Sequence, residues 1–248
     1  MTAAAIARRP AATAAGAVFG GLATLRGRRS LHPDGASYEA VVRIDGDERY
    51  ARDASRGEIA AAVPLLARPG SHRALLRFSR GLGLPSRLPD ALGVAVRLCD
   101  LYGERAHQDL LMTTSAKPPV LHHLLLPALR GPFGQPYSTI LPYRVGGGVR
   151  LFGVLPLAAP AHDARSDLEE FADAAARGAA RFALALAAPF RGWRAVGVVE
   201  TGAPLDRETG ERLRFNPWNT GGGIRPVGPF QGLRDAAYGA SQRARLTA

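Results

Sequence analysis

A tyrosine near the C-terminus lies where arginine side chains could activate it. In a helix over 234–245, Tyr238 lies about 40° from Arg234 around the axis, and Arg245 lies about 20° from Arg234. One face would therefore carry a phenol between two guanidinium groups. A nearby cation favours the phenolate and lowers the pKa of a phenol from its usual value of about 10. Because a phenolate is a hard anionic ligand, Tyr238 is a candidate metal ligand. The alternative interpretation is an arginine-rich surface helix.

The composition is that of an ordinary globular chain with an excess of arginine. The sequence has 248 residues, 46% of them hydrophobic and 21% charged, with a net charge of +11. Lys117 is the only lysine, and the arginines are dispersed rather than clustered with aromatic residues. A basic balance can attract nucleic acid. No nucleic-acid recognition motif accompanies it here, so we expect no nucleic-acid partner.

The single cysteine and the N-terminal segment limit the cellular setting. Cys99 stands alone, which excludes a disulfide framework and a cysteine-based metal site. Residues 1–28 are alanine-rich, with Arg8 and Arg9 before an apolar stretch that loosely resembles a secretory signal. Gly20 and Gly21 interrupt that stretch, and no clear cleavage site follows. We therefore expect an N-terminal arm over 1–28, no membrane span and a cytoplasmic protein.

The hydrophobic patterning predicts an α+β protein dominated by strands. Alternation and β-branched content predict eight strands, at 37–44, 74–79, 93–98, 107–113, 138–145, 149–157, 181–187 and 195–200. Eight strands suffice to close a barrel. Helices are predicted at 120–129 and at 166–178, where Ser166 and Glu169 form a capping-box pattern. The three glycines at 146–148 indicate a hairpin turn, because they lack the strand-to-helix context of a phosphate loop.

Several segments, in order along the chain, resemble motifs of the catalase family. They are the stretch 29–38 with Arg29 and His32, Leu75-Leu76-Arg77-Phe78-Ser79, the stretch 89–97, Asp109-Leu110-Leu111-Met112-Thr113-Thr114, Phe215-Asn216-Pro217-Trp218, the stretch 225–228, and the arginine–tyrosine pattern at 234–245. The resemblance implies a closed eight-stranded antiparallel β-barrel of catalase type with flanking helices. It also implies a single haem-binding domain over 29–248 that lacks the C-terminal helical domain of full catalases.

The same resemblance implies a haem b cofactor and the residues that hold it. Tyr238 is the implied iron ligand, as tyrosinate is in catalase, and Arg234 keeps the phenol ionised. Arg29, Arg77 and Arg245 are the implied partners of the haem propionates. A planar guanidinium group recognises a carboxylate with two parallel hydrogen bonds, which suits this role. In an alternative alignment Tyr238 matches a tyrosine of the family that does not bind iron.

Three further residues have implied catalytic roles. His32 is the implied general base, which moves a proton between the two oxygens of peroxide, and Ser79 orients its ring. Thr113 stands where catalases carry an asparagine that hydrogen-bonds peroxide. A hydroxyl has one donor where the amide has two, so we expect weak oxygen-evolving activity.

These expectations combine into a hypothesis for function. We expect a minimal catalase-related haem peroxidase that uses hydrogen peroxide or organic hydroperoxides with a small organic reductant, and that can form a homo-oligomer. The alternatives are a haem-dependent isomerase or dehydratase of fatty-acid hydroperoxides, a haem-free binding protein with the same barrel, and a haem carrier or sensor.

Overall fold

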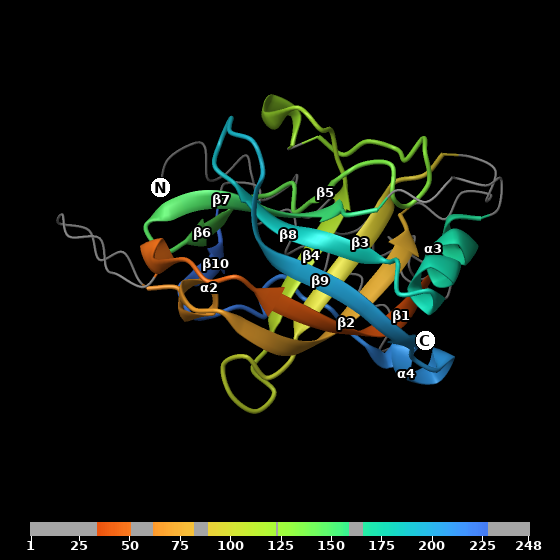
Figure 1. Ribbon diagram of the computed structural model, residues 1–248, viewed down its shortest axis with the longest axis horizontal. Helices are drawn as coiled ribbons and strands as arrows, with labels where there is room; N and C mark the ends of the chain where they lie inside the picture. Colours follow the sequence, from red (N-terminus) through yellow and green to blue (C-terminus); the bar gives the residue numbers. More distant parts are fainter. Residues whose placement is uncertain (1–33, 51–61, 82–88, 123, 159–165, 228–248) are drawn as a thin grey trace, which may run out of the picture.

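The fold is a barrel with short helices at its ends (Figure 1). The computed structural model describes residues 34–50, 62–81, 89–122, 124–158 and 166–227. The strands are β1 (Gly35–Ile44), β2 (Gly70–Arg80), β3 (Leu92–Leu98), β4 (Gln108–Thr114), β5 (Tyr137–Ser138), β6 (Tyr143–Val145), β7 (Gly148–Pro156), β8 (Arg181–Ala187), β9 (Arg194–Pro204) and β10 (Ile224–Pro226). The helices are η1 (Glu48–Tyr50), α2 (Pro64–Ala67), η2 (Pro119–Leu121), α3 (Asp167–Ala176) and α4 (Arg207–Arg212). The arm expected at 1–28 lies outside the described residues.

The described strands close into an eight-stranded antiparallel barrel, as the sequence predicts. Pairing runs from β1 through β2, β3, β4, β5, β7, β8 and β9, and β9 returns to β1. Strands β6 and β10 extend from β7 as a side flap. The predicted hairpin at 146–148 is confirmed: β6 turns into β7 through Gly146, whose φ of 57° belongs to the left-handed region that glycine enters without strain.

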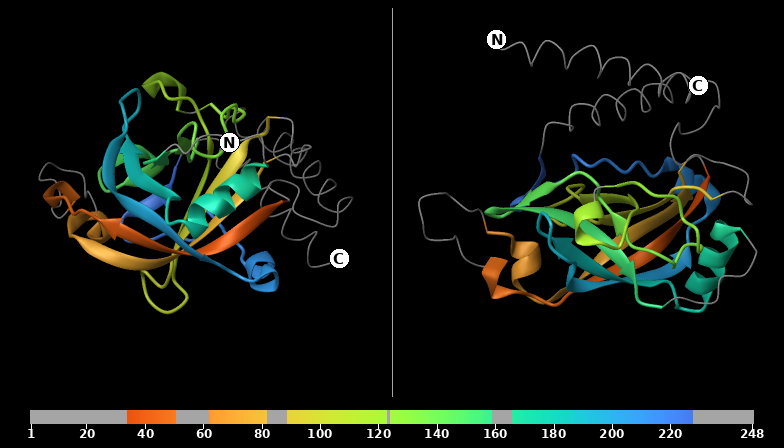
Figure 2. Two further views of the ribbon diagram at one scale, coloured as in Figure 1. Left: turned by 45° about the vertical axis from the view of Figure 1, so that its right-hand side comes forward. Right: turned by 90° about the horizontal axis from the view of Figure 1, so that it is seen from above.

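The barrel interior is filled by apolar side chains that alternate along each strand. On β2, Leu76 and Phe78 are fully buried, as are Val96 on β3 and Leu110 on β4. Helix α3 covers one end of the barrel (Figure 2). Its Phe171 stacks on Phe78 with ring centroids 4.2 Å apart, which seals that end with an aromatic contact.

Helix α3 begins as its sequence predicts. The Ser166 side chain accepts from the Glu169 backbone N–H, and the Glu169 side chain accepts from the Ser166 backbone N–H. The helix is also tied to the barrel by charge, since the buried Arg80 of β2 forms ion pairs with Asp167 and Asp90. These contacts fix the angle at which α3 meets the end of the barrel.

Two predicted elements are wrong. The helix predicted at 120–129 is a single 3-10 turn, Pro119–Leu121. The chain then runs beside β4, where the Leu126 backbone N–H donates to the Thr114 carbonyl at 3.0 Å, so its donor serves the sheet rather than a helix. The strand predicted at 138–145 is two short strands, β5 and β6. Ile140 between them has a φ of 58°, which breaks the extended backbone.

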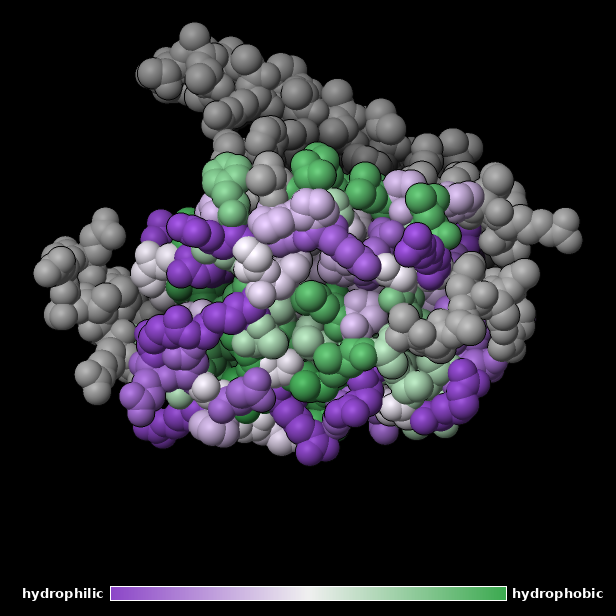
Figure 3. All heavy atoms as spheres, turned by 45° about the horizontal axis from the view of Figure 1, so that its top comes forward, coloured by the Kyte–Doolittle hydropathy of each residue, from purple (hydrophilic) through white to green (hydrophobic). Residues whose placement is uncertain are grey.

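The outer surface combines apolar and charged areas. Figure 3 shows hydrophobic spheres along the upper border of one face, above a band of hydrophilic ones. The exposed large apolar side chains of the described residues include a run after β4: Leu121, Leu124, Leu125, Leu126 and Leu129. No helix within the described ranges is long and apolar enough to cross a membrane.

Candidate functional site

Ser79 and Thr113 share one row on the outer face of the barrel. Ser79 of β2 pairs with Gly93 of β3, and Gly93 pairs with Thr113 of β4. Directly paired residues of antiparallel strands point to the same side of a sheet. Since Phe78 points into the barrel, Ser79 and Thr113 point outward. They are two strands apart, about 10 Å at the usual strand spacing, and Gly93 between them has no side chain.

The whole row consists of small residues. It begins at Gly35 of β1, which pairs with Ser79, and it continues from Thr113 to Ser138 of β5. No side chain in the row from Gly35 to Ser138 is larger than threonine. Glycine within a strand often marks a place where a ligand or another backbone approaches closely. The row is therefore suited to close contact with a flat group.

Arg77 lies in the next row of the same face. It is two residues before Ser79 on β2, pairs with Ser37 of β1, and is only 6% exposed. Its position depends on Gly35, because a Cβ at residue 35 would lie 3.0 Å from Nη2 of Arg77 and 2.5 Å from the Phe78 carbonyl oxygen. Gly35 thus lets the guanidinium group pass close to the backbone of β1. A buried guanidinium beside a row of small residues is suited to a carboxylate-bearing ligand.

The hydroxyl groups of Ser79 and Thr113 both turn toward β3. Ser79 Oγ donates to the Gly93 carbonyl at 3.5 Å, and Thr113 Oγ1 donates to the Leu92 carbonyl at 3.0 Å. A hydroxyl has one proton to donate. The Thr113 proton is therefore already used within the sheet, which leaves only the lone pairs of this oxygen for a second partner.

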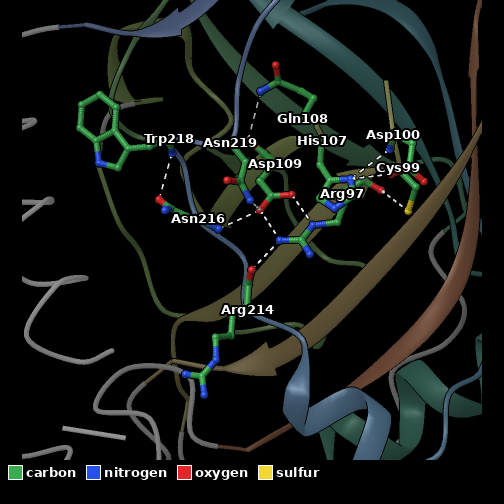
Figure 4. A network of polar contacts seen from close by, with 10 residues as sticks. All are labelled: Arg97, Cys99, Asp100, His107, Gln108, Asp109, Arg214, Asn216, Trp218 and Asn219. Carbon is green, nitrogen blue, oxygen red and sulfur yellow. Dashed lines mark hydrogen bonds and ion pairs between the residues drawn. The ribbon is translucent and has the colours of Figure 1, made fainter. Parts of the chain in front are cut away.

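A third row carries an ion pair buried on the outer face (Figure 4). Arg97 of β3 donates to both carboxylate oxygens of Asp109 on β4, each at 2.7 Å. The Asp109 side chain is fully buried, and the ring of Phe215 lies 5.1 Å from the Arg97 guanidinium carbon. Burial alone would lower the pKa of Arg97, but the hydrogen bonds and charge of Asp109 raise its pKa. Arg97 therefore stays protonated.

This ion pair anchors the segment that follows α4. Asp109 accepts from the Asn216 backbone N–H at 2.8 Å and from the Asn219 side chain at 2.9 Å, while the Asp109 backbone N–H donates to the Asn219 carbonyl at 2.9 Å. Arg97 also donates to the Arg214 carbonyl. The residues 214–219 are thereby held across β3 and β4, one row from Arg77. We call this group of contacts the Asp109 latch.

Reasoning from the sequence missed the latch, although its residues lie in recognised motifs. The available signal is a charged residue at an outward strand position, as Arg97 is in β3 and Asp109 in β4. Two such residues of opposite charge predict a cross-strand pair only when the register is known. The role of Asn216 and Asn219 has no local signal, because their partner is more than 100 positions away.

The remaining predicted site residues lie outside the described ranges. They are His32 and Arg29 before β1, and Arg234, Tyr238 and Arg245 after β10. Their roles stay predictions, and the structure brings together Arg77, Ser79 and Thr113 alone. Within the described part of the chain, no group of three or more histidine, cysteine, aspartate or glutamate side chains could hold a metal ion.

Comparison with solved structures identifies the type of barrel. A bacterial catalase matches with a TM-score of 0.62 and 12% identity, over 88% of this chain and 57% of that one. A fungal catalase matches with a TM-score of 0.64 and 13% identity, over 92% of this chain and 62% of that one. The fold is catalase-like. No protein-family model and no curated protein matches the sequence. The chain thus spans about three fifths of the length of these catalases.

The described face of this catalase-like barrel fits part of what a haem group needs. Haem is planar and carries two carboxylates, which correspond to a row of small residues and to the buried Arg77 beside it. The iron ligand has to come from elsewhere, since the row itself offers only hydroxyl groups. Tyr238 is the candidate for that ligand from sequence.

Proposed function

We propose that the protein is a haem-dependent peroxidase that acts on hydrogen peroxide or organic hydroperoxides, with weak catalase activity. The observation that carries the proposal is the outer face of a catalase-like barrel on which Arg77, Ser79 and Thr113 lie together. Haem b, when bound, supplies the redox chemistry that reduces peroxide at the expense of a small organic reductant. The chain's own residues bind the cofactor, move protons and limit which reaction follows.

The proposed binding residues combine one metal ligand with four cations. Tyr238 would supply a phenolate to the iron, with Arg234 stabilising its negative charge. Arg77 would pair with a propionate from the outer face of β2, where its burial strengthens a charge-assisted hydrogen bond. Arg29 and Arg245 would complete the set of propionate partners.

The proposed proton chemistry rests on His32. An imidazole titrates near neutral pH, so His32 can take a proton from one oxygen of peroxide and return it to the leaving oxygen. That transfer lets the leaving oxygen depart as water rather than as hydroxide. Ser79, which points out of the barrel in the same row as Thr113, would hold the imidazole ring at a fixed orientation.

The hydrogen bond of Thr113 supports peroxidase over catalase activity. Efficient release of oxygen requires that a second peroxide be held and oxidised, and a side-chain donor near the substrate helps to hold it. The single proton of Thr113 is committed to the Leu92 carbonyl at 3.0 Å. We therefore expect an organic reductant, rather than a second peroxide, to complete the cycle.

The first experiment is an absorption titration of the purified chain with haem. We expect a Soret band with high-spin ferric features, which shifts or disappears in Tyr238→Phe. Arg77→Gln should weaken haem uptake by about tenfold, the loss of one charge-assisted contact worth about 1.4 kcal/mol. Arg73→Gln is the matched control, since Arg73 is on the same strand with a side chain that is 74% exposed and paired with Asp100.

Two outcomes would decide against the proposal. Absence of a Soret band after reconstitution would exclude a haem enzyme and would favour the haem-free binding protein. A Soret band together with fast oxygen release and slow oxidation of organic reductants would exclude the peroxidase and favour a true catalase.

A further inference from the structure

A second site lies at the opposite end of the barrel from α3. A cavity of about 330 Å³ opens between η1, the residues before α2, the β6–β7 hairpin and the connection from β8 to β9. In Figure 1, α2 and β6 lie at one end of the molecule and α3 at the other, and Figure 2 agrees. The row of small residues begins at Gly35, the first residue of β1. Tyr50, which lines the cavity, follows the last residue of β1, Ile44. The 10 residues of β1 span about 30 Å, which separates Gly35 from Tyr50 of the cavity. The other end of the row comes closer to the cavity, since Ser138 pairs with Gly153 of β7 and Arg150 lies three residues away on that strand.

Four arginines line this cavity. They come from four places in the chain: Arg49 on η1, Arg150 on β7, Arg191 before β9 and Arg194 at its start. We call this group the arginine pocket. Its apolar wall is formed by Val63, Val145, Leu186 and Ala188. A cationic rim with an apolar wall is the composition expected for a small organic anion.

A single carboxylate offsets part of this charge. Asp47 forms ion pairs with Arg49 at 2.9 Å and with Arg194 at 2.8 Å. The hydrogen bonds from Arg49 and then Arg194 hold the pKa of Asp47 far below its usual value, so it stays ionised at neutral pH. Four guanidinium groups against one carboxylate leave three uncompensated positive charges among the described residues.

Two of the arginines are left for a ligand. Among the described residues, no carboxylate forms an ion pair with Arg150 or Arg191. Arg150 is nevertheless held in place, since its Nη1 donates to the Val149 carbonyl at 2.7 Å. Its guanidinium group lies over Gly148, where a Cβ would be only 2.6 Å from Nη1. The glycine thus makes room for a guanidinium that is preorganised at the cavity.

We propose that the arginine pocket binds a small organic molecule carrying two phosphate groups. Phosphate oxygens match the two parallel donors of a guanidinium group, and two such groups would use Arg150 and Arg191 together. The volume of about 330 Å³ is at the lower end of small-molecule sites, about 300 to 1,000 Å³, which favours a compact ligand. The apolar wall would contact its carbon skeleton. This site does not depend on haem and extends the protein beyond the peroxidase function.

The test is calorimetric titration of the full chain with inorganic pyrophosphate and with fructose 1,6-bisphosphate. We expect saturable binding of one equivalent that weakens as salt is added. Arg150→Gln and Arg191→Gln should each reduce affinity by about tenfold or more, while Arg150→Lys should retain part of it because the charge remains. Circular dichroism verifies that each variant is folded.

Arg177→Gln is the matched control, because Arg177 is an exposed arginine at the end of α3, at the other end of the barrel. Equal loss in the control and in the pocket variants would show attraction by the net charge of +11 and would overturn the proposal. Failure of both probes to bind would also overturn it. Citrate that binds as tightly as the phosphate probes would overturn the assignment to phosphates.

Discussion

The two faces of β2, β3 and β4 differ in chemistry, although alternate residues of the same three strands form them. Leu76, Phe78 and Val96 point inward and are fully buried in an apolar core. Four outward residues are nearly as buried, yet they are polar: Arg77, Ser79, Arg97 and Asp109. Burial therefore does not separate core from site in this barrel. The two faces differ in the kind of contact that their buried side chains make: apolar packing on the inner face, and hydrogen bonds or ion pairs on the outer face.

The comparison also shows how the two faces contribute to stability. Inward residues contribute through apolar area and dense packing, which depend little on the identity of any one partner. The outward Asp109 latch depends on specific partners in β3 and in the segment after α4. Loss of one partner on the outer face leaves a buried charge, whereas loss of one inner side chain leaves a void.

The largest effect is expected on the inner face. Phe78→Ala removes the ring that stacks on Phe171 at 4.2 Å and leaves a cavity at the α3 end. We expect the free energy of unfolding to fall by about 3 to 5 kcal/mol, measured by urea denaturation. Leu75→Ala, at an outward and half-buried position of the same strand, should cost about 1 kcal/mol. Equal costs would contradict the division between the two faces.

The second effect concerns the latch. Asp109→Asn keeps the shape of the side chain but leaves Arg97 as a buried cation without its carboxylate, so we expect a loss of about 3 kcal/mol. Hydrogen exchange of the Asn216 amide should speed up, because its acceptor is weakened. The double variant Arg97→Met with Asp109→Leu should be more stable than Asp109→Asn. A double variant that is less stable would mean that the pair contributes net stability beyond avoiding an unpaired charge.

The smallest effect on stability, and the most specific one on activity, is expected at Thr113. Thr113→Asn adds a donor at the row of small residues and should raise oxygen release relative to reductant oxidation by about tenfold. Thr113→Val removes the hydrogen bond to Leu92 and should cost about 1 kcal/mol of stability without raising oxygen release. An electrode assay beside a dye-oxidation assay measures the ratio. An unchanged ratio in Thr113→Asn would exclude this residue as the cause of the weak catalase activity that we propose.

The sequence alone predicted the elements whose signals are local. The capping box at Ser166, the glycine hairpin at 146–148 and the alternating strands were all recognisable, because each depends on residues a few positions apart. The prediction of a helix at 120–129 was wrong, although the leucines and histidines of this segment are compatible with a helix. Only the neighbouring strand β4 showed that the backbone hydrogen bonds go elsewhere.

The sequence by itself thus predicted most of the strands and, through its motifs, the barrel type. It also named Arg77, Ser79 and Thr113 as site residues, and their roles stay predictions. Only the tertiary structure decided which side chains meet. The Asp109 latch joins residues more than 100 positions apart, and the arginine pocket gathers side chains from η1, β7 and the β8–β9 connection. The physical reason is that register and barrel closure set these contacts. Both are decided by packing of the whole sheet rather than by any short stretch of residues.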